Sequence, residues 1–251
     1  MPECQPPTLD SRLKARSPET GSRHVMNQRW ESLLFLHWEV SPELIQTTLP
    51  PGLYVDTFEG SAFVGVVPFF MKHIRPVGCP PLPWLSYFQE LNVRTYVYNE
   101  QGIPGVWFYS LDCNQPLAVW AARTWFHLPY LHSKMTYKKS DWVLYHSHRA
   151  GTDVTASFEY RGVGVERESD PETLEFFLLE RYYLYAYHAT RRSLFRGQVA
   201  HSPYRYRNAE VRKLSTLPLK YDGFSSLPDA PIHQCMAEGL DVKIMGLEVC
   251  F

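Results

Sequence analysis

The residues of this chain best suited to chemistry lie in one short segment, FQELNVRTYV, residues 88–97. Its polar and apolar residues alternate as in a β-strand, whose successive side chains point to opposite faces. One face carries Leu91, Val93, Thr95 and Val97 and is predicted to be buried. The other face carries Glu90, Asn92 and Arg94 between aromatic residues. If this face lines a cavity, an acid, an amide and a guanidinium converge on a small ligand. The alternative is a solvated face, with Glu90 and Arg94 as a surface ion pair of little value.

A second group of polar residues lies nearer the carboxyl terminus, in the segments LERYYLY and LFRGQVAHSPY. Arg181, Tyr182 and His201 are its ligand-binding candidates. Because arginine binds carboxylates through paired hydrogen bonds, Arg181 or His201 could complete an anion-binding pocket with Arg94. The alternative is structural: a glutamate–arginine pair and neighbouring tyrosines would hold a helix against the sheet.

No metal site or cofactor is expected. His127 and His132 lack the i, i+4 spacing that places two ligands on one helix face, and His146 and His148 have no third ligand nearby. The five cysteines are scattered and never paired as C-x-x-C, which indicates reduced thiols in a cytosolic protein. The chain also lacks the glycine-rich dinucleotide and phosphate-loop motifs and the G-x-S-x-G motif.

Composition narrows the class of protein. The 251 residues are 45% hydrophobic, enough for one sizeable core, and the net charge of −1 predicts no nucleic-acid partner. The longest apolar run, about residues 61–71, is too short to span a bilayer, which takes about 20 residues. The amino terminus has no apolar signal-peptide core. We therefore expect a cytoplasmic protein with no membrane partner. The oligomeric state stays open.

The elements that position these residues are many short strands and a few helices. Ser41-Pro42 and Ser169-Asp170-Pro171 are helix-start signals, and a third helical pattern follows Pro116. Because helices do not alternate regularly with strands, the pattern predicts an α+β fold around a mostly antiparallel sheet.

Residues 1–25 are polar, rich in proline and serine, and without periodicity, so they are predicted to be disordered. A single domain is expected over residues 26–251. Met26, where the ordered domain is expected to begin, is also a candidate start residue.

From Trp30 to about Leu214 the chain resembles a bacterial family, the domain of unknown function 2071 or YqjF-like family, within the acetoacetate decarboxylase-like superfamily. The resemblance is carried, in order, by WESLLFLHWEV, LPPGLYVDTFEGSAFVGVVPF, FQELNVRTYV, GVWFYSLD, AARTWFHLPYLHSKM, LERYYLYAY and LFRGQVAHSPY. It implies a closed, cone-like antiparallel β-barrel with surrounding helices and a central cavity, toward which Glu90, Asn92 and Arg94 would point.

The resemblance also shows where chemistry departs from the superfamily. Acetoacetate decarboxylases form a Schiff base through a lysine kept neutral by a neighbouring cation. Their motif is an arginine, a short helical stretch and Pro-Lys-Lys. Here Arg123 is followed by Leu128-Pro129-Tyr130-Leu131, so a phenol, which cannot form an imine, replaces the lysine.

The leading hypothesis is a polar-lined cavity that binds a small anionic or carbonyl-bearing organic molecule. Glu90 would act as general acid or base, Arg94 would hold a carboxylate, and Tyr130 would donate a hydrogen bond. Whether the protein turns anything over is left open. The alternatives are a non-catalytic binding module, a filled barrel with a structural role, and a lyase of the decarboxylase or aldolase type acting on a keto acid through Lys134.

Overall fold

The computed structural model describes residues 5–250, which form twelve strands and five short helices. The strands are β1 (His24–Val40), β2 (Leu53–Val55), β3 (Ala62–Pro76), β4 (Phe88–Asn99), β5 (Pro104–Cys113), β6 (Tyr130–Lys139), β7 (Val143–Arg149), β8 (Ala156–Arg167), β9 (Tyr183–His188), β10 (Ser193–His201), β11 (Tyr206–Lys213) and β12 (His233–Val249). The helices are α1 (Leu9–Lys14), α2 (Pro42–Thr48), α3 (Pro116–Trp125), α4 (Leu174–Leu179) and α5 (Leu217–Tyr221).

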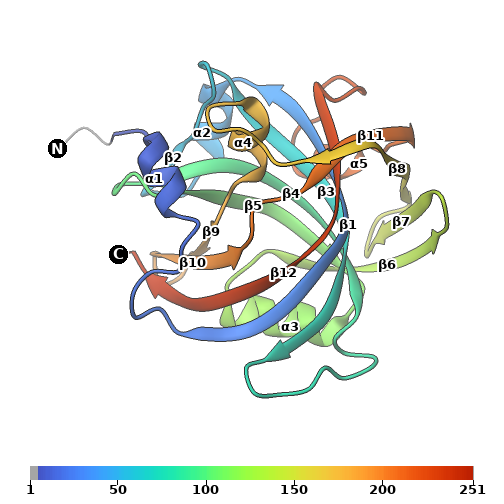
Figure 1. Cartoon of the computed structure of the whole chain (residues 1–251), viewed down its shortest axis with the longest axis horizontal. Helices are drawn as coiled ribbons and strands as arrows, with labels where there is room; N and C mark the ends of the chain where they lie inside the picture. The colour runs from blue at the N-terminus through green and yellow to red at the C-terminus, as the bar shows by residue number, and fades with distance from the viewer. Residues whose placement is uncertain (1–4, 251) are drawn as a thin grey trace.

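The sheet closes on itself (Figure 1). Strands β1, β3, β4, β5, β9, β10 and β12 are hydrogen-bonded in that order, and β12 pairs back with β1. Strands β6, β7, β8 and β11 branch from this ring at β5 and rejoin it at β12. Only the pairings of β5 with β6 and with β9 are parallel among the described strands. The predicted mostly antiparallel closed sheet with few helices is confirmed.

Helix boundaries follow local capping. The side chain of Ser41 accepts a hydrogen bond from Leu44 N, and Pro42 occupies the first turn of α2, as predicted. The later helix begins further along the chain than its Ser-Asp-Pro signal indicates, because Thr173 is the residue that caps α4. α4 ends at Leu179 and leads directly into the LERYYLY segment.

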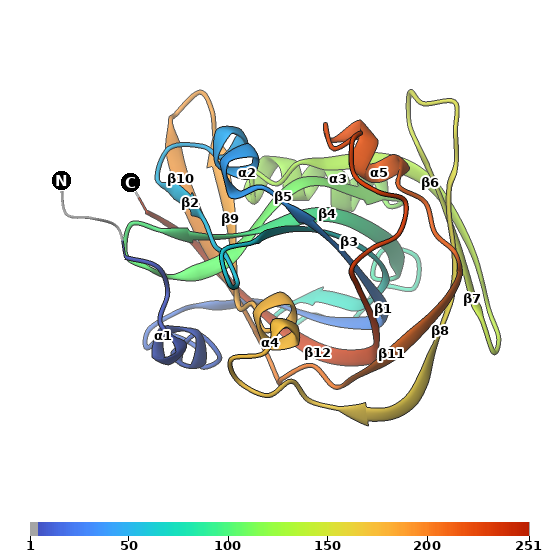
Figure 2. The ribbon, with the colours of Figure 1, turned by 90° about the horizontal axis from the view of Figure 1, so that it is seen from above.

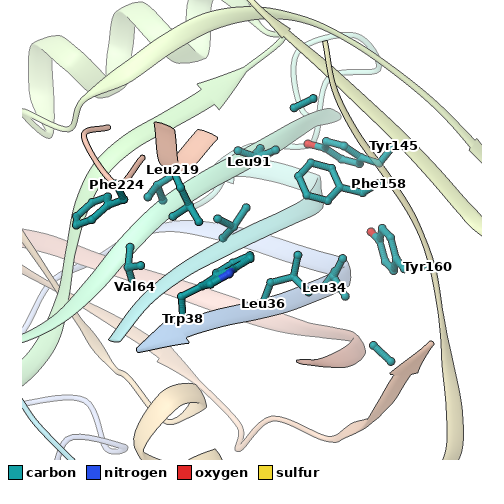
Figure 3. Close-up of a cluster of buried hydrophobic side chains, with 14 of the residues drawn as sticks. Leu34, Leu36, Trp38, Val64, Leu91, Tyr145, Phe158, Tyr160, Leu219 and Phe224 are labelled. Carbon is teal, nitrogen blue, oxygen red and sulfur yellow. The ribbon is translucent and has the colours of Figure 1, made fainter. Parts of the chain in front are cut away.

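The neighbouring strands β1 and β3 bury apolar side chains on both faces. One cluster lies on one face of these strands, with Leu34, Trp38, Leu91 and Phe158 among its members (Figure 3). A second cluster lies on the opposite face of the same strands and includes Phe35. Burial on both faces explains why residues 33–36 of β1 and 62–71 of β3 read as hydrophobic runs.

The amino-terminal segment is folded against the domain, so the prediction of disorder is wrong for residues 5–25. α1 carries Arg12, whose guanidinium forms two 2.7 Å hydrogen bonds to the buried carboxylate of Asp56. No residue of α1 is buried. The segment is therefore ordered by polar partners from the domain, which its own composition does not reveal. The first four residues lie outside the described part of the chain.

The side chain of Gln198, a buried residue of β10, binds backbone atoms of this amino-terminal segment. Its carboxamide accepts a 3.0 Å hydrogen bond from Glu19 N and donates to the carbonyl oxygens of Ala15 and Ser17 at 3.2 and 2.7 Å. Figure 2 shows α1 beside one end of the ring, near α4. In residues 5–250 no helix is long and apolar enough to cross a membrane.

Candidate functional site

The polar face of β4 is buried. Glu90, Asn92 and Arg94 are 3%, 5% and 7% exposed, because β4 is flanked by β3 and β5 within the closed ring. A solvated outer face is therefore wrong for this strand. Glu90 and Arg94 also form no ion pair with each other, and no described carboxylate forms one with Arg94.

Glu90 and Tyr130 form a buried acid–phenol pair. Tyr130 opens β6, whose parallel pairing with β5 sets Tyr130 opposite Leu111, and its hydroxyl donates a 2.5 Å hydrogen bond to Glu90 Oε2. Burial raises the pKa of Glu90 to about 7, and hydrogen bonds from Tyr130 and Asn92 oppose that rise. Burial also holds the pKa of Tyr130 well above 10. Near neutral pH, Glu90 can therefore exist in both protonation states while Tyr130 stays a donor.

Lys134 does not share this environment. It lies four residues further along β6, beyond the part of β6 that pairs with β5. There it is opposite His148 of β7, and its side chain is exposed. A lysine that attacks a carbonyl group must lose its proton near neutral pH, which burial or a neighbouring cation brings about. The position of Lys134 offers no burial of this kind.

Arg94 is a buried cation with few partners. Its Nη2 donates to Leu178 O at 3.2 Å and lies 3.5 Å from the hydroxyl of Tyr96, while its Nε has no partner. The guanidinium stacks over Phe35, 5.3 Å from the ring centroid. On the same face Asn92 Oδ1 is buried and without a partner. Buried polar groups are nearly always satisfied, so these two atoms are exceptions on the polar face of β4.

Arg181 and Tyr182 have structural partners. Arg181 Nη1 contacts Asp56 Oδ2 at 2.6 Å, and its Nε donates to Phe177 O at 2.7 Å. The Tyr182 hydroxyl donates to Glu180. These contacts are structural in kind, but Arg181 pairs with Asp56 and Glu180 with Arg16, so the glutamate–arginine pair expected within the LERYYLY segment is not formed.

His201 has a different set of neighbours from the Glu90–Tyr130 pair. Its ring stacks on Tyr182 with centroids 4.5 Å apart, its Nδ1 lies 2.7 Å from Ser202 O, and its Nε2 is buried without a partner. Burial lowers its pKa to about 4, so the imidazole is neutral at pH 7. His201 lines an open cleft of about 860 Å³, and it is the only one of the seven predicted site residues that does.

Sequence reasoning missed a second buried polar group beside Arg94. The Tyr96 hydroxyl lies 2.7 Å from His37 Nε2, and His37 Nδ1 lies 2.9 Å from His233 Nδ1. Burial holds the pKa of His37 well below 6.5. Gly65 faces this histidine in the register, where a Cβ would lie 3.0 Å from the imidazole ring. A histidine within the apolar run SLLFLHWEV was the available signal.

The fold is acetoacetate decarboxylase-like. An acetoacetate decarboxylase-like enzyme from Sphingomonas wittichii RW1 has a similar structure, with a TM-score of 0.61 and 13% identity, covering 91% of this chain and 93% of that one. The enduracididine biosynthesis enzyme MppR with HEPES bound gives a TM-score of 0.63 at 14% identity, over 91% and 88% of the two chains. The same enzyme complexed with pyruvate gives 0.58 at 15%, over 93% of each.

The chain belongs to the DUF2071 family, described as an uncharacterized conserved protein, which matches residues 27–241. The uncharacterized protein YqjF of Bacillus subtilis (strain 168) is 35% identical to it over 189 residues, which are 74% of this chain and 77% of that protein.

Proposed function

We propose that the protein binds a small carboxylate-bearing organic molecule, one that also carries a carbonyl group, inside the ring of strands. Arg94 anchors the carboxylate, and the Glu90–Tyr130 pair exchanges a proton with the ligand. The observation that carries the proposal is the buried Arg94 guanidinium, which no described carboxylate neutralises. Leaving such a charge unpaired costs free energy that an anionic ligand would recover.

The spacing along β4 sets the size of the ligand. Alternate residues on one strand face are about 6.7 Å apart, so Glu90 and Arg94 flank Asn92 at roughly that distance on either side. Glu90 is hydrogen-bonded to Asn92, whereas the Arg94 guanidinium lies near Leu178 O and the Tyr96 hydroxyl, so a ligand that meets both ends of the face must extend past Asn92. The unpartnered Asn92 Oδ1 would accept a hydrogen bond from a ligand hydroxyl, as in an enol.

The chemistry open to this pair is proton transfer beside a carbonyl group. An ionised Glu90 could accept a proton from the carbon next to the carbonyl. As Glu90 becomes protonated, the Tyr130 hydroxyl could turn its hydrogen bond from Glu90 to the oxygen on which negative charge develops. The pyruvate complex of MppR supports this ligand class, since pyruvate carries both a carboxylate and a carbonyl. Imine chemistry at Lys134 is the weaker candidate, because Lys134 is exposed.

The first test is binding of pyruvate and acetoacetate by calorimetry to the full chain and to Arg94→Met. A buried charge-assisted pair contributes about 2 kcal/mol or more, so this variant should bind at least about 30-fold more weakly. Arg191→Met, which removes an exposed arginine, is the control and should bind like the parent protein. Equal affinity of Arg94→Met and the parent for both acids would contradict the role of Arg94 in binding the carboxylate.

The second test is borohydride treatment with each keto acid, followed by intact mass. The proposal predicts no covalent adduct, because the group that contacts Glu90 is the phenol of Tyr130, which cannot form an imine. An adduct mapped to Lys134 would replace proton transfer with Schiff-base lyase chemistry. Retention of ligand hydrogen exchange in Glu90→Gln, measured by NMR of pyruvate in deuterated water, would remove the acid–base role.

A further inference from the structure

The open cleft at one end of the molecule is built separately from the Glu90 face. It holds about 860 Å³, within the range of small-molecule sites. Its walls come from the amino-terminal segment, the start of β1, the end of β3 with its following loop, and the neighbouring parts of β10 and β12. Figure 1 shows β1 and β12 running side by side here. None of Glu90, Asn92 and Arg94 lines it.

The charge of this cleft is strongly one-sided. Four cations line it, namely Arg16, Arg29, Arg75 and Lys243, against the single carboxylate of Asp241. Two of these cations are already paired: Arg29 with Glu31 at 2.9 Å and with Asp241 at 3.4 Å, and Arg16 with Glu180 at 3.6 Å. The protein as a whole has a net charge of −1, so this local excess of positive charge is a property of the cleft.

Two of the cations have no carboxylate partner among residues 5–250. Arg75 Nη1 donates to His73 O at 2.8 Å, and neither Arg75 nor Lys243 forms an ion pair in that range. The strand register brings them together, because Asn27 of β1 pairs with Arg75 of β3 on one side and with Lys243 of β12 on the other. Residues directly opposite across strands share a face with Cβ atoms about 5 Å apart. The two free cations therefore flank one amide side chain.

Three further features of the lining point to a ligand. Arg16 Nε and His201 Nε2 are buried and have no hydrogen-bond partner. His73 adopts a left-handed backbone conformation with φ of 51°, at the place where the pairing of β1 with β3 shifts register. Such bulges redirect side chains and are enriched next to binding sites.

We propose that this cleft is a binding site for a small molecule carrying a diphosphate group. Arg75 and Lys243 bind its two phosphoryl groups from either side, and Asn27 donates a hydrogen bond between them. The unpartnered Nε of Arg16 donates a further hydrogen bond from the amino-terminal segment. A single carboxylate is too small to meet both free cations, whereas two linked phosphoryl groups carry several negative charges over a longer span. Arg16 and Lys243 lie outside the 27–241 family match, so the site is not inherited from the matched region alone. It is independent of the function proposed for Arg94.

Pyrophosphate titration of the full chain by calorimetry tests this site. The parent protein should bind pyrophosphate, and the double variant Arg75→Met/Lys243→Met should bind it at least 10-fold more weakly. The matched control Lys138→Met/Arg191→Met removes the same charge from exposed positions without ion pairs and should change affinity less than twofold. Arg94→Met should bind like the parent protein.

The same titration can overturn the proposal. Undiminished binding in Arg75→Met/Lys243→Met, or an equal loss in the control, would show that the cleft is not the site. Loss of binding in Arg94→Met would place the anion inside the ring. Citrate binding as tight as that of pyrophosphate would reject the diphosphate class. A melting temperature of the double variant within a few degrees of the parent's separates lost binding from lost folding.

Discussion

The two faces of β4 are equally buried and opposite in chemistry. Leu91 and Val93 are fully enclosed in the cluster that also holds Trp38, shown in Figure 3. Glu90 and Arg94 on the other face are 3% and 7% exposed. Burial therefore does not distinguish the two faces. The polar face differs because it carries an acid whose pKa is raised by burial and a cation without a counter-charge.

This difference separates stability from function within one strand. The apolar face stabilises the fold, because each buried aliphatic side chain is removed from water and closely packed. The polar face lowers stability, because its charge and its unpartnered oxygen have lost hydration. A site that costs free energy in the empty protein is one that a ligand can complete. The following variants test this contrast, from the largest expected effect to the smallest.

Leu91→Ala should have the largest effect. It removes fully buried atoms and leaves a cavity, which costs about 2–5 kcal/mol of unfolding free energy. Urea unfolding followed by tryptophan fluorescence measures the loss. A cost below about 1 kcal/mol would mean that this face is not the tightly packed one.

Glu90 should make stability fall as the pH rises. Its pKa is about 7 in the folded state, against an ordinary value of 4.5 for the unfolded chain, so the folded state keeps the proton longer. Its contribution is complete below pH 4.5 and is lost as the pH rises through 7, by roughly 3 kcal/mol in total. Between pH 5 and pH 8 the unfolding free energy should therefore fall by about 2.5 kcal/mol more in the parent than in Glu90→Gln. Equal differences in the two proteins would show that Glu90 has an ordinary pKa.

Tyr130→Phe should have an intermediate effect. It removes the 2.5 Å hydrogen bond to Glu90, a loss of about 1–3 kcal/mol for a bond to a charged group. Because that bond opposes the rise in the pKa of Glu90, the pKa should move higher still in the variant. Carbon-13 NMR of labelled glutamate side chains would measure this shift. A lower pKa in Tyr130→Phe would contradict the assigned hydrogen bond.

Arg94→Met should change stability least, by less than about 1 kcal/mol, and the change is expected to be favourable. Replacing a buried unpaired charge with an apolar side chain of similar length removes a desolvation cost. Comparing the free energies of urea unfolding of Arg94→Met and Leu91→Ala compares the two faces of β4 directly. A loss as large as that of Leu91→Ala would mean that Arg94 is structural, and the contrast between the faces would fail.

Several features followed from the sequence. The alternation of residues 88–97 predicted a strand with one polar face, and Ser41-Pro42 predicted the start of α2. Both depend on neighbouring residues, because side-chain direction and helix capping are set within a few positions. The expectation that Tyr130 stands where the superfamily has a lysine rested on the motif alone.

The sequence did not predict which residues would become ion-pair or hydrogen-bond partners. Arg181 was a candidate for an anion pocket, but it binds Asp56, 125 positions away in the sequence, which also binds Arg12. The same contact orders an amino-terminal segment whose composition predicted disorder. The hydrogen bond between Tyr130 and Glu90 spans 40 residues, and the cleft at His201 gathers side chains from four strands.

The sequence by itself determined which residues alternate, which cap helices and which lack an amine, because short-range sterics and chemistry settle those properties. The tertiary structure alone decided that the polar face of β4 is enclosed, that Arg94 has no acid beside it, and that Arg75 and Lys243 flank one asparagine. Those outcomes depend on ring closure and on the register between strands distant in the chain, which no local pattern encodes.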